Sequence, residues 1–383
     1  MFLAAYVDDI VMLDPVTILK DEFEMFNFTY RDPPQRVERL LSVRSRMFWR
    51  EGVPHVFLDQ AQFAKMLVDS FLEEYKKKGF GERLPRADSP GLADVPNEER
   101  DEAAEGAFAD KAPHWIGRLL YLARGTRPDI QFCVTRMGRY ATAWTVVQDD
   151  WLVRCISYIA RHTEEGLEYH GRAGVRARRN EQDETSEGAS PFDSLHMHHH
   201  TDSDHAGDKD TRRSTAGWDT IISDSDKPPR VQDAGVFALI DWNTKGMNTA
   251  AWSTGEAEIA TLNEGLRRSG LPHWMLRQDL AMQQKMLLTV YGDAQACQGA
   301  VERGASAKMR YIRKTQAVRI AWLRGVLAMV EGVRLVDTRT GDMLADPFTK
   351  PLAAVNMIPL LLAIGLCLFK GAECVHQDSK EER

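Results

Sequence analysis

Apolar and polar positions follow distinct patterns along this chain. Ile116, Leu119, Leu120 and Ala123 recur at i, i+3, i+4 and i+7, and the run 151–159 repeats this helical spacing. Residues at these positions lie on one face of a helix, so the region before residue 171 predicts a pair of amphipathic helices.

A different pattern begins after residue 194. Two β-rich runs, 218–222 and 236–242, precede a long helical pattern over about 256–282. The remaining predicted elements are a strand at 286–291, a helix from 296, a helix over 315–330 and a strand at 333–337. Early strands followed by alternating helices and strands predict an α/β (mixed α+β) fold, in which helices cover a mixed sheet.

Three stretches interrupt these patterns. Residues 79–111 are dense in Pro, Gly, Asp and Glu, which indicates a linker. Residues 171–194, GRAGVRARRNEQDETSEGASPFDS, are charged and nearly without large apolar side chains, a composition typical of a disordered segment. The third stretch is the tail after residue 376. A chain of 383 residues interrupted in this way predicts more than one domain.

The charge balance limits how the chain could hold a nucleic acid. Its formal net charge is -7 at pH 7, so contact with phosphates must depend on local basic runs. Two such runs are Arg36, Arg39, Arg44, Arg46 and Arg50, and then Lys308, Arg310, Arg313, Lys314 and Arg319. Each run could equally be the solvated face of a helix. The longest apolar run, 357–368, is shorter than the roughly 20 residues that span a bilayer, so we expect no membrane partner.

Four acidic residues fall at the ends or starts of predicted elements. Asp202 lies in HHHTDSDHAGD at the end of a strand, and Glu258 lies one turn inside the long helix. Asp293 ends the strand LLTVYGD, and Asp346 in GDMLADPFTKPL begins a late helix. A two-metal phosphodiester nuclease needs carboxylates that converge from different elements, because Mg²⁺ prefers oxygen ligands and two ions serve the attacking and leaving oxygens.

Each acid also has a simpler interpretation. An Asp at a strand end is usually a helix cap or a turn residue, and Asp204, Asp208 and Asp210 compete with Asp202 for the first position. We retain Asp202 because it lies where the strand should end. The histidines of HMHHH, residues 196 and 198–200, could bind a soft metal, but we expect them to form a polar approach to the strand.

The order of several motifs carries more information than any single acid. TDSDHAGDKDTRRSTAG is followed by WNTK, STGEAEIATL, VYGDAQA and LADPFTKPL. This series resembles the ribonuclease H domain of copia-type LTR retrotransposons over about 150 residues. The resemblance implies a ribonuclease H-like mixed five-stranded sheet flanked by helices, with Asp202, Glu258, Asp293 and Asp346 as catalytic, metal-binding residues. The implied cofactor is Mg²⁺, with Mn²⁺ as a substitute, and the implied partner is an RNA–DNA hybrid.

Three positions depart from the family's pattern. His205 replaces the Trp after the second Asp, Met247 replaces the Gln of the strand motif, and Tyr311 replaces the His of the KHI-like segment. None of them is an implied metal ligand, although the last departure puts substrate handling or product release in doubt.

The resemblance extends towards the N-terminus. AAYVDDIVML resembles the YxDD hairpin of reverse transcriptases, in which two aspartates bind metals, here Asp8 and Asp9. A reverse transcriptase has a further palm Asp and nucleotide-holding fingers before this hairpin. Only five residues precede Tyr6 in the sequence, so we expect Asp8 and Asp9 to be vestigial. IGRLLYLARGTRPDIQF and ISYIARHTEEGLEYHG resemble the family's connecting segment.

These observations divide the chain into predicted parts. They are a truncated reverse-transcriptase palm remnant (1–78), a linker (79–111), a helical connecting segment (112–171), a disordered linker (172–194), a ribonuclease H-like domain (195–352) and a C-terminal tail (353–383).

Three hypotheses about function follow from the sequence. The first is a retrotransposon-derived ribonuclease H that cuts the RNA strand of RNA–DNA hybrids. The second is a catalytically inactive nucleic-acid-binding remnant of a degenerate element, which the drifted positions favour. The third is a host enzyme or an integrase-like transposase, which would share the fold class. An integrase would have a zinc-binding HHCC module before its catalytic domain, and the sequence shows no such module.

Overall fold

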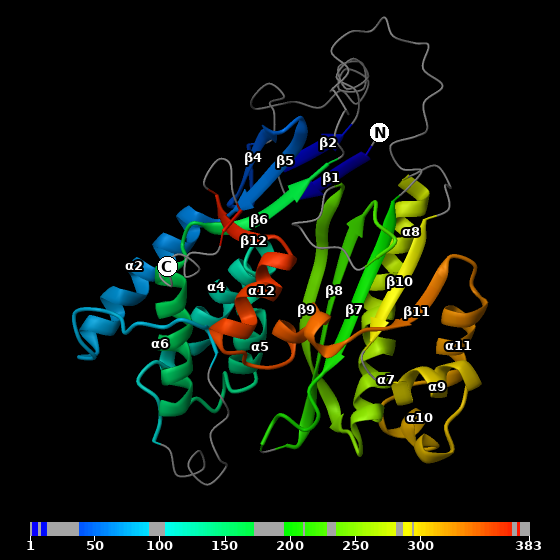
Figure 1. Ribbon diagram of the computed structural model, residues 1–383. Coiled ribbons are helices and arrows are strands. Elements are labelled where there is room, and N and C mark those ends of the chain that lie inside the picture. Colours follow the sequence, from blue (N-terminus) through cyan, green and yellow to red (C-terminus); the bar gives the residue numbers. More distant parts are fainter. Residues whose placement is uncertain are drawn as a thin grey trace, which may run out of the picture.

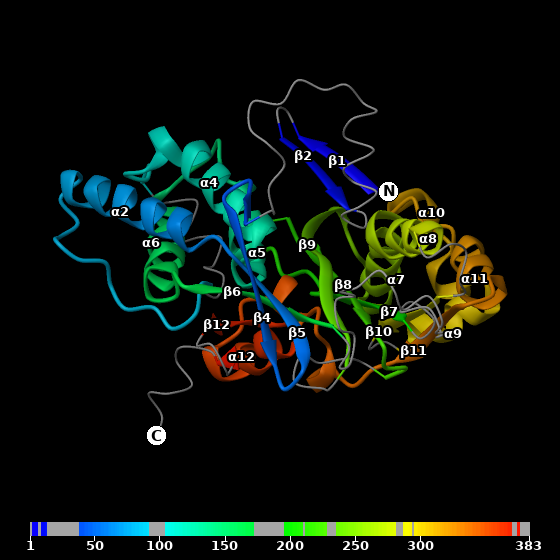
Figure 2. The same ribbon diagram turned by 90° about the horizontal axis from the view of Figure 1, so that it is seen from above.

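The computed structural model describes residues 2–6, 9–13, 38–91, 104–171, 195–209, 211–227, 235–280, 286–292, 295–369 and 374–375 (Figure 1). One layer of helices lies on each side of a large twisted sheet, as the view from above also shows (Figure 2). The prediction of a mixed α/β fold with helices around a mixed sheet is therefore confirmed.

Five strands form the half of the sheet that follows residue 195. They are β7 (His196–Ser203), β8 (Arg213–Ser223), β9 (Phe237–Ala250), β10 (Leu287–Gly292) and β11 (Val333–Asp337). Their order is β11-β10-β7-β8-β9. The pairs β7–β8 and β8–β9 are antiparallel, whereas β10 runs parallel to both β7 and β11. These five strands agree with the predicted mixed sheet.

The sheet is larger than predicted, because it continues beyond β9 to a total of eleven strands. The added strands are β6 (Glu165–His170), β5 (Val53–Asp59), β4 (Val43–Arg50), β3 (Arg39–Leu40), β12 (Leu366–Phe369) and β13 (Cys374–Val375). Strand β6 joins the two halves through the pair His170–Phe237. Segments predicted as a palm remnant, a connecting segment and a tail thus contribute to one sheet.

The helices pack on both faces of this sheet. They are α2 (Ala61–Lys77), α4 (Ala112–Gly125), α5 (Gln131–Gly138), α6 (Val146–Arg161), α7 (Thr254–Gly265), α8 (Leu271–Leu280), α9 (Gln295–Arg303), α10 (Ile312–Thr315), α11 (Ile320–Met329) and α12 (Ala354–Ala363). Strands β7 and β8 are buried along almost their whole length, as expected of strands covered on both faces.

Two hydrophobic cores lie between these layers. The first joins Trp115 of α4 and Trp151 of α6 to Trp242 of β9. The second joins Trp218 of β8 to Leu323 of α11 and to the apolar face of α7. The first core also includes side chains from residues 343–366, so the end of the chain packs with its earlier helices.

Several predicted elements have different bounds in the structure. The predicted helix pair before residue 171 is three helices followed by strand β6. The predicted helix over 315–330 is α10 and α11, separated at Ala317, whose φ of 56° lies in the left-handed region. The long helix contains a π turn, Leu266–Gly270, between α7 and α8.

The N-terminal motif forms the predicted hairpin. Strands β1 (Phe2–Tyr6) and β2 (Asp9–Leu13) pair antiparallel, with Tyr6 opposite Asp9. Asp8 lies outside the described residues, as does the side chain of Asp9, so their role stays a prediction. No helix in the described ranges is both long enough and apolar enough to cross a membrane.

Candidate functional site

The candidate site begins at the end of strand β7. Asp202 is the penultimate residue of this strand and is only 2% exposed. In the sheet register Asp202 is opposite Gly217 of β8, which is opposite Thr244 of β9. A row across three strands thus forms the floor of the site.

A short 3-10 turn, Asp346–Phe348, lies on this row. Thr244 Oγ1 donates a hydrogen bond of 2.7 Å to the carbonyl oxygen of Phe348. A Cβ added at Gly217 would lie 2.6 Å from Thr349 Cγ2 and 2.8 Å from Phe348 Cβ. The turn can therefore reach the sheet only because residue 217 has no side chain.

Asp346 is brought beside Asp202 by this turn. Lys350 Nζ is 2.9 Å from Asp346 Oδ1 and 3.8 Å from Asp202 Oδ2. Thr349 Oγ1 donates a hydrogen bond to Asp202 Oδ2. Burial, and then the charge of Asp202, raises the pKa of Asp346 to about 6. Two buried carboxylates and one lysine therefore form a compact charged group.

Asp346 was predicted to begin a late helix, but it begins only the short 3-10 turn. Its turn is followed by Pro351, which lacks an N–H group and disfavours the helical conformation in the residue before it. The late helix α12 begins only at Ala354. The carboxylate is thus held by an irregular turn instead of by a helix.

Glu258 lies on the opposite side of β7, in the first half of α7. Its Oε1 accepts a hydrogen bond of 2.8 Å from Ser203 Oγ, and the residue is 5% exposed. Consecutive strand residues point to opposite faces, so Ser203 faces α7 while Asp202 faces the C-terminal turn. Glu256 has a different role, because it accepts a hydrogen bond of 2.8 Å from the backbone N–H of Trp252 at the start of this helix.

Asp293 lies outside the described residues. Strand β10, which pairs with β7, ends one residue earlier, at Gly292. Across the described residues, no three histidine, cysteine, aspartate or glutamate side chains form a group that could hold a metal ion. The structure therefore brings Asp202 and Asp346 together but does not place Glu258 with them, and a position of Asp293 beside this pair stays a prediction.

The competing acids have other partners. Asp204 accepts a hydrogen bond from the backbone N–H of Thr215, and burial raises the pKa of Asp204 to about 6. Asp208 accepts a hydrogen bond of 2.9 Å from the Thr211 N–H. Asp210 lies outside the described residues. Both described competitors thus stabilise the turn between β7 and β8.

The histidine run is part of the core, which corrects the prediction of a polar approach to the strand. His198, His199 and His200 are fully buried in the middle of β7. Their Nδ1 atoms lie 2.9, 2.9 and 2.7 Å from side-chain oxygens of Tyr291, Thr220 and Asp219, respectively. Burial lowers the pKa of both His198 and His199 to about 3. His198 and His199 can therefore be buried as neutral, hydrogen-bonded rings.

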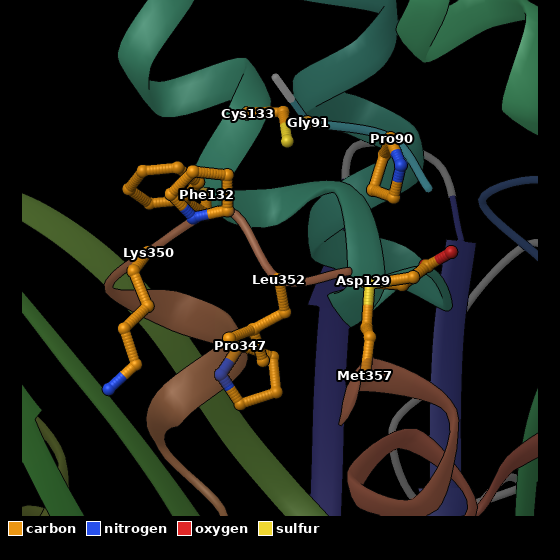
Figure 3. A pocket seen from close by; sticks show the side chains of 10 residues that line it. Pro90, Gly91, Asp129, Phe132, Cys133, Pro347, Lys350, Leu352 and Met357 are labelled. Atoms are coloured by element: carbon orange, nitrogen blue, oxygen red, sulfur yellow. The ribbon is translucent and has the colours of Figure 1, made fainter. Parts of the chain in front are cut away.

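A small cavity of about 10 Å³ lies beside the site (Figure 3). Its lining includes Phe132 and Cys133 from α5 together with Pro347 and Lys350. The amino group of Lys350 points away from Cys133 in this view. A volume of about 10 Å³ has room for about one water molecule, so we place no ligand in this cavity.

Four residues of the site were not singled out from the sequence. Gly217, Thr244, Thr349 and Lys350 all lie in motifs that carried the resemblance, namely RRSTAG, WNTK and TKPL. Those motifs contained the signal, but neither periodicity nor composition distinguishes these four residues from their neighbours. Their roles depend on contacts between segments more than 100 residues apart.

The three departures from the family's pattern lie in different surroundings. His205 Nε2 is 3.3 Å from the carbonyl oxygen of Ala251, and Met247 is buried in the second core. Tyr311 is 36% exposed, and its ring centroid is 6.0 Å from that of Trp252. Tyr311 and His205 are both exposed and can be reached by a partner, whereas Met247 cannot.

Fold and site together define an α/β protein with a buried pair of carboxylates at the end of a central strand. Over 365 residues the chain is 24% identical to the retrovirus-related Pol polyprotein from transposon TNT 1-94 of Nicotiana tabacum, a match that covers 91% of this chain. Over 244 residues it is 27% identical to the retrovirus-related Pol polyprotein from transposon RE2 of Arabidopsis thaliana, covering 63% of this chain. The chain is thus related to retrotransposon Pol polyproteins, which confirms the resemblance.

The matched regions are a small part of these relatives. They cover 23% of the first polyprotein and 14% of the second. No protein-family model matches the chain, and no solved structure matches it.

Proposed function

We propose that residues 195–352 hydrolyse the RNA strand of RNA–DNA hybrids with the help of divalent cations. The observation that carries this proposal is the buried pair Asp202 and Asp346, held together at the end of β7. Carboxylates this close repel each other, and the single charge of Lys350 cannot balance two of them, so a divalent cation would stabilise the pair. The relation to Pol polyproteins supports the same function.

The donor set fits Mg²⁺ or Mn²⁺ in its chemistry, because carboxylate oxygens are the ligands that these cations prefer. Asp202 and Asp346 would hold the cation, and we propose Asp293 as a further ligand. Glu258 accepts its hydrogen bond from Ser203 on the other face of β7, so its side chain would have to leave Ser203 to join them. When bound, the divalent cations supply an activated water and stabilise the leaving 3′-oxygen, which yields RNA products with 3′-hydroxyl ends. Thr349 fixes the orientation of the Asp202 carboxylate through its hydrogen bond.

The second basic run is the surface we propose for the hybrid. Its five cations, Lys308, Arg310, Arg313, Lys314 and Arg319, are all exposed. The neighbouring Trp252 is 79% exposed and lies beside Tyr311. Exposed cations with interleaved aromatic rings suit phosphates and bases, and recognition through helix shape and 2′-hydroxyls needs little sequence specificity.

The first basic run is less suited to this role. Arg44 and Arg46 form ion pairs of 3.1 and 3.0 Å with the buried Asp59. Arg50 forms an ion pair of 3.0 Å with Glu168. These arginines neutralise buried acids within the sheet, and Arg36 lies outside the described residues.

A second candidate function is binding of the hybrid without cleavage. Tyr311 favours it, because a ring without a titratable nitrogen replaces the histidine of the family's KHI-like segment. A binding-only protein would retain the basic surface and lose metal-dependent turnover.

Cleavage of a hybrid tests the proposal. The chain is incubated with an RNA–DNA hybrid labelled on the RNA, with Mg²⁺, with Mn²⁺ or with a chelator. We expect internal cuts in the RNA that require the metal, and a loss of roughly 100-fold or more in rate for Asp202→Asn. Asp241→Asn, which alters an acid of β9 that pairs with Arg124, is the matched control and should cleave as the parent does. Binding of the hybrid without cleavage would overturn the proposal in favour of the second candidate.

A further inference from the structure

Lys350 has an unusual position for a lysine that belongs to a metal-dependent site. Its Nζ is 2.9 Å from Asp346 Oδ1 and 3.8 Å from Asp202 Oδ2, so one ammonium group forms ion pairs with both carboxylates. The side chains of Asp202 and Asp346 are 3% and 11% exposed, whereas that of Lys350 is 38% exposed. The cation thus reaches the buried pair from the solvent side.

The turn that carries Lys350 is tied down on both sides of it. Thr349 donates to Asp202, and Pro351 restricts the backbone of the residue before it. The backbone of Lys350 is therefore placed by the turn, while its side chain remains a long and flexible stem. A lysine ammonium is a compact charge with no fixed fork geometry, so it can move away without disturbing the backbone.

We propose that Lys350 competes with the divalent cation for the Asp202–Asp346 pair and withdraws into solvent when that cation binds. This inference rests on the proposed function, since it assumes that the pair holds a metal. In the metal-free protein the lysine relieves the repulsion between the two carboxylates. Because metal binding must displace this positive charge, Lys350 lowers the apparent affinity for the metal. In the absence of metal, the same lysine keeps the site ordered.

An ordinary structural ion pair would make a different prediction. Lys350 and Asp346 are four residues apart, a spacing at which lysine and aspartate often pair on a protein surface without any link to a ligand. Removing such a pair changes stability equally with and without metal. Removing a competitor lowers the metal-free stability and raises the stabilisation that metal provides.

The test compares Lys350→Met with Lys245→Met in the full chain. Lys245 of β9 is a matched control, since its side chain is 32% exposed and it forms an ion pair with Glu264 of helix α7. Binding of Mn²⁺ alone is measured by calorimetry, and melting temperatures are measured with a chelator and with Mn²⁺, without any nucleic acid.

We expect Lys350→Met to bind Mn²⁺ about three- to tenfold more tightly than the parent, because a partly screened positive charge has been removed from the site. Its melting temperature should be below that of the parent in chelator, and its rise on adding Mn²⁺ should be larger. Lys245→Met should bind Mn²⁺ as the parent does.

Equal Mn²⁺ affinity in Lys350→Met and the parent would overturn the competition while leaving the proposed function intact. If neither protein binds Mn²⁺ at millimolar concentration, both the competition and the proposed function are overturned. If Lys350→Arg, which retains the charge, also binds more tightly than the parent, charge is not the cause and the competition is again overturned.

Discussion

Gly217 determines how closely the C-terminal turn approaches the sheet. A Cβ at this position would lie within 3.0 Å of both Thr349 and Phe348. Asp346 therefore lies beside Asp202 because Gly217, on the neighbouring strand β8, leaves room for the turn. A single residue without a side chain controls the geometry of a site to which it contributes no chemical group.

We expect Gly217→Ala to lower the free energy of unfolding by about 1–3 kcal/mol, because an added methyl group in a packed contact forces the turn away. Hybrid cleavage should fall with it. Gly117→Ala is the control, since nothing lies within 4 Å of a Cβ built there in α4 and alanine favours a helix. Denaturant unfolding of both variants measures the difference, and equal stability of Gly217→Ala and the parent would contradict this account of the turn.

Two buried histidines, His198 and His199, predict a loss of stability in acid. Their folded pKa values are lowered to about 3, whereas unfolded histidines take up a proton near pH 6.5. Between these values the unfolded state binds more protons, so the free energy of unfolding falls as the pH falls. The raised pKa of Asp346 and of Asp204 acts in the opposite direction below about pH 6.

A difference measurement isolates one histidine. Between pH 7.5 and 5.5 the parent should lose about 1 kcal/mol more unfolding free energy than His199→Gln, because the variant has one titrating group fewer. His114→Gln, which alters an exposed side chain, should follow the parent. Parallel pH profiles for the parent and His199→Gln would show that the burial of this ring does not affect stability in acid.

At the scale of elements, local sequence patterns predicted the helices and strands that depend on residues close together in the chain. The strands of the sheet half after residue 195 and the helix from residue 296 have short-range periodicity and were found near their predicted places. Strand β6 was missed because its partners β5 and β12 lie about 100 and 200 residues away. The separation of α10 from α11 depends on Ala317, a residue type that gives no signal of a left-handed turn.

In the site, too, local patterns identified some residues, whereas those that act through long-range contacts could not be identified. Asp202 could be chosen over its neighbours because it lies where a predicted strand ends, and its meeting with Asp346 was expected from the resemblance. Lys350, Thr349 and Gly217 could not be assigned from local pattern, since each acts through a contact across the sheet.

Arg127 connects the elements of the helical layer. Its guanidinium is 2.6 Å from Asp129 Oδ2 and donates a hydrogen bond of 2.6 Å to the carbonyl oxygen of His162 at the end of α6. The two charged side chains are almost fully buried. The TRPDI motif is therefore a structural link between the turn after α4 and the end of α6.

We expect Arg127→Met to cost about 3–5 kcal/mol of unfolding free energy, because it leaves the Asp129 charge buried without its partner. Arg86→Met breaks an exposed pair with Asp88 and should cost about 1 kcal/mol or less. Chemical denaturation of both variants tests this, and a similar small cost for the two would contradict a structural role of the buried pair.

At the scale of the whole molecule, one sheet extends from the hairpin of β4 and β5 to the strands that carry the site. Helix α12 packs into the first core with the earlier helices, and β12 pairs with β6, so the segment after the C-terminal turn is anchored as well. The distance between Asp202 and Asp346 is thus set by the whole fold. The central claim is that these two acids, brought together by the fold, act as one metal-dependent unit.

A double-mutant cycle on hybrid cleavage tests this claim most directly. Cleavage rates in Mn²⁺ are measured for the parent, Asp202→Asn, Asp346→Asn and the double variant. We expect each single substitution to lower the rate by roughly 100-fold or more, and the double variant to be no slower than the slower single variant, because residues that act as a unit are not additive. Multiplicative losses in the double variant, or parent-like cleavage by either single variant, would contradict the claim.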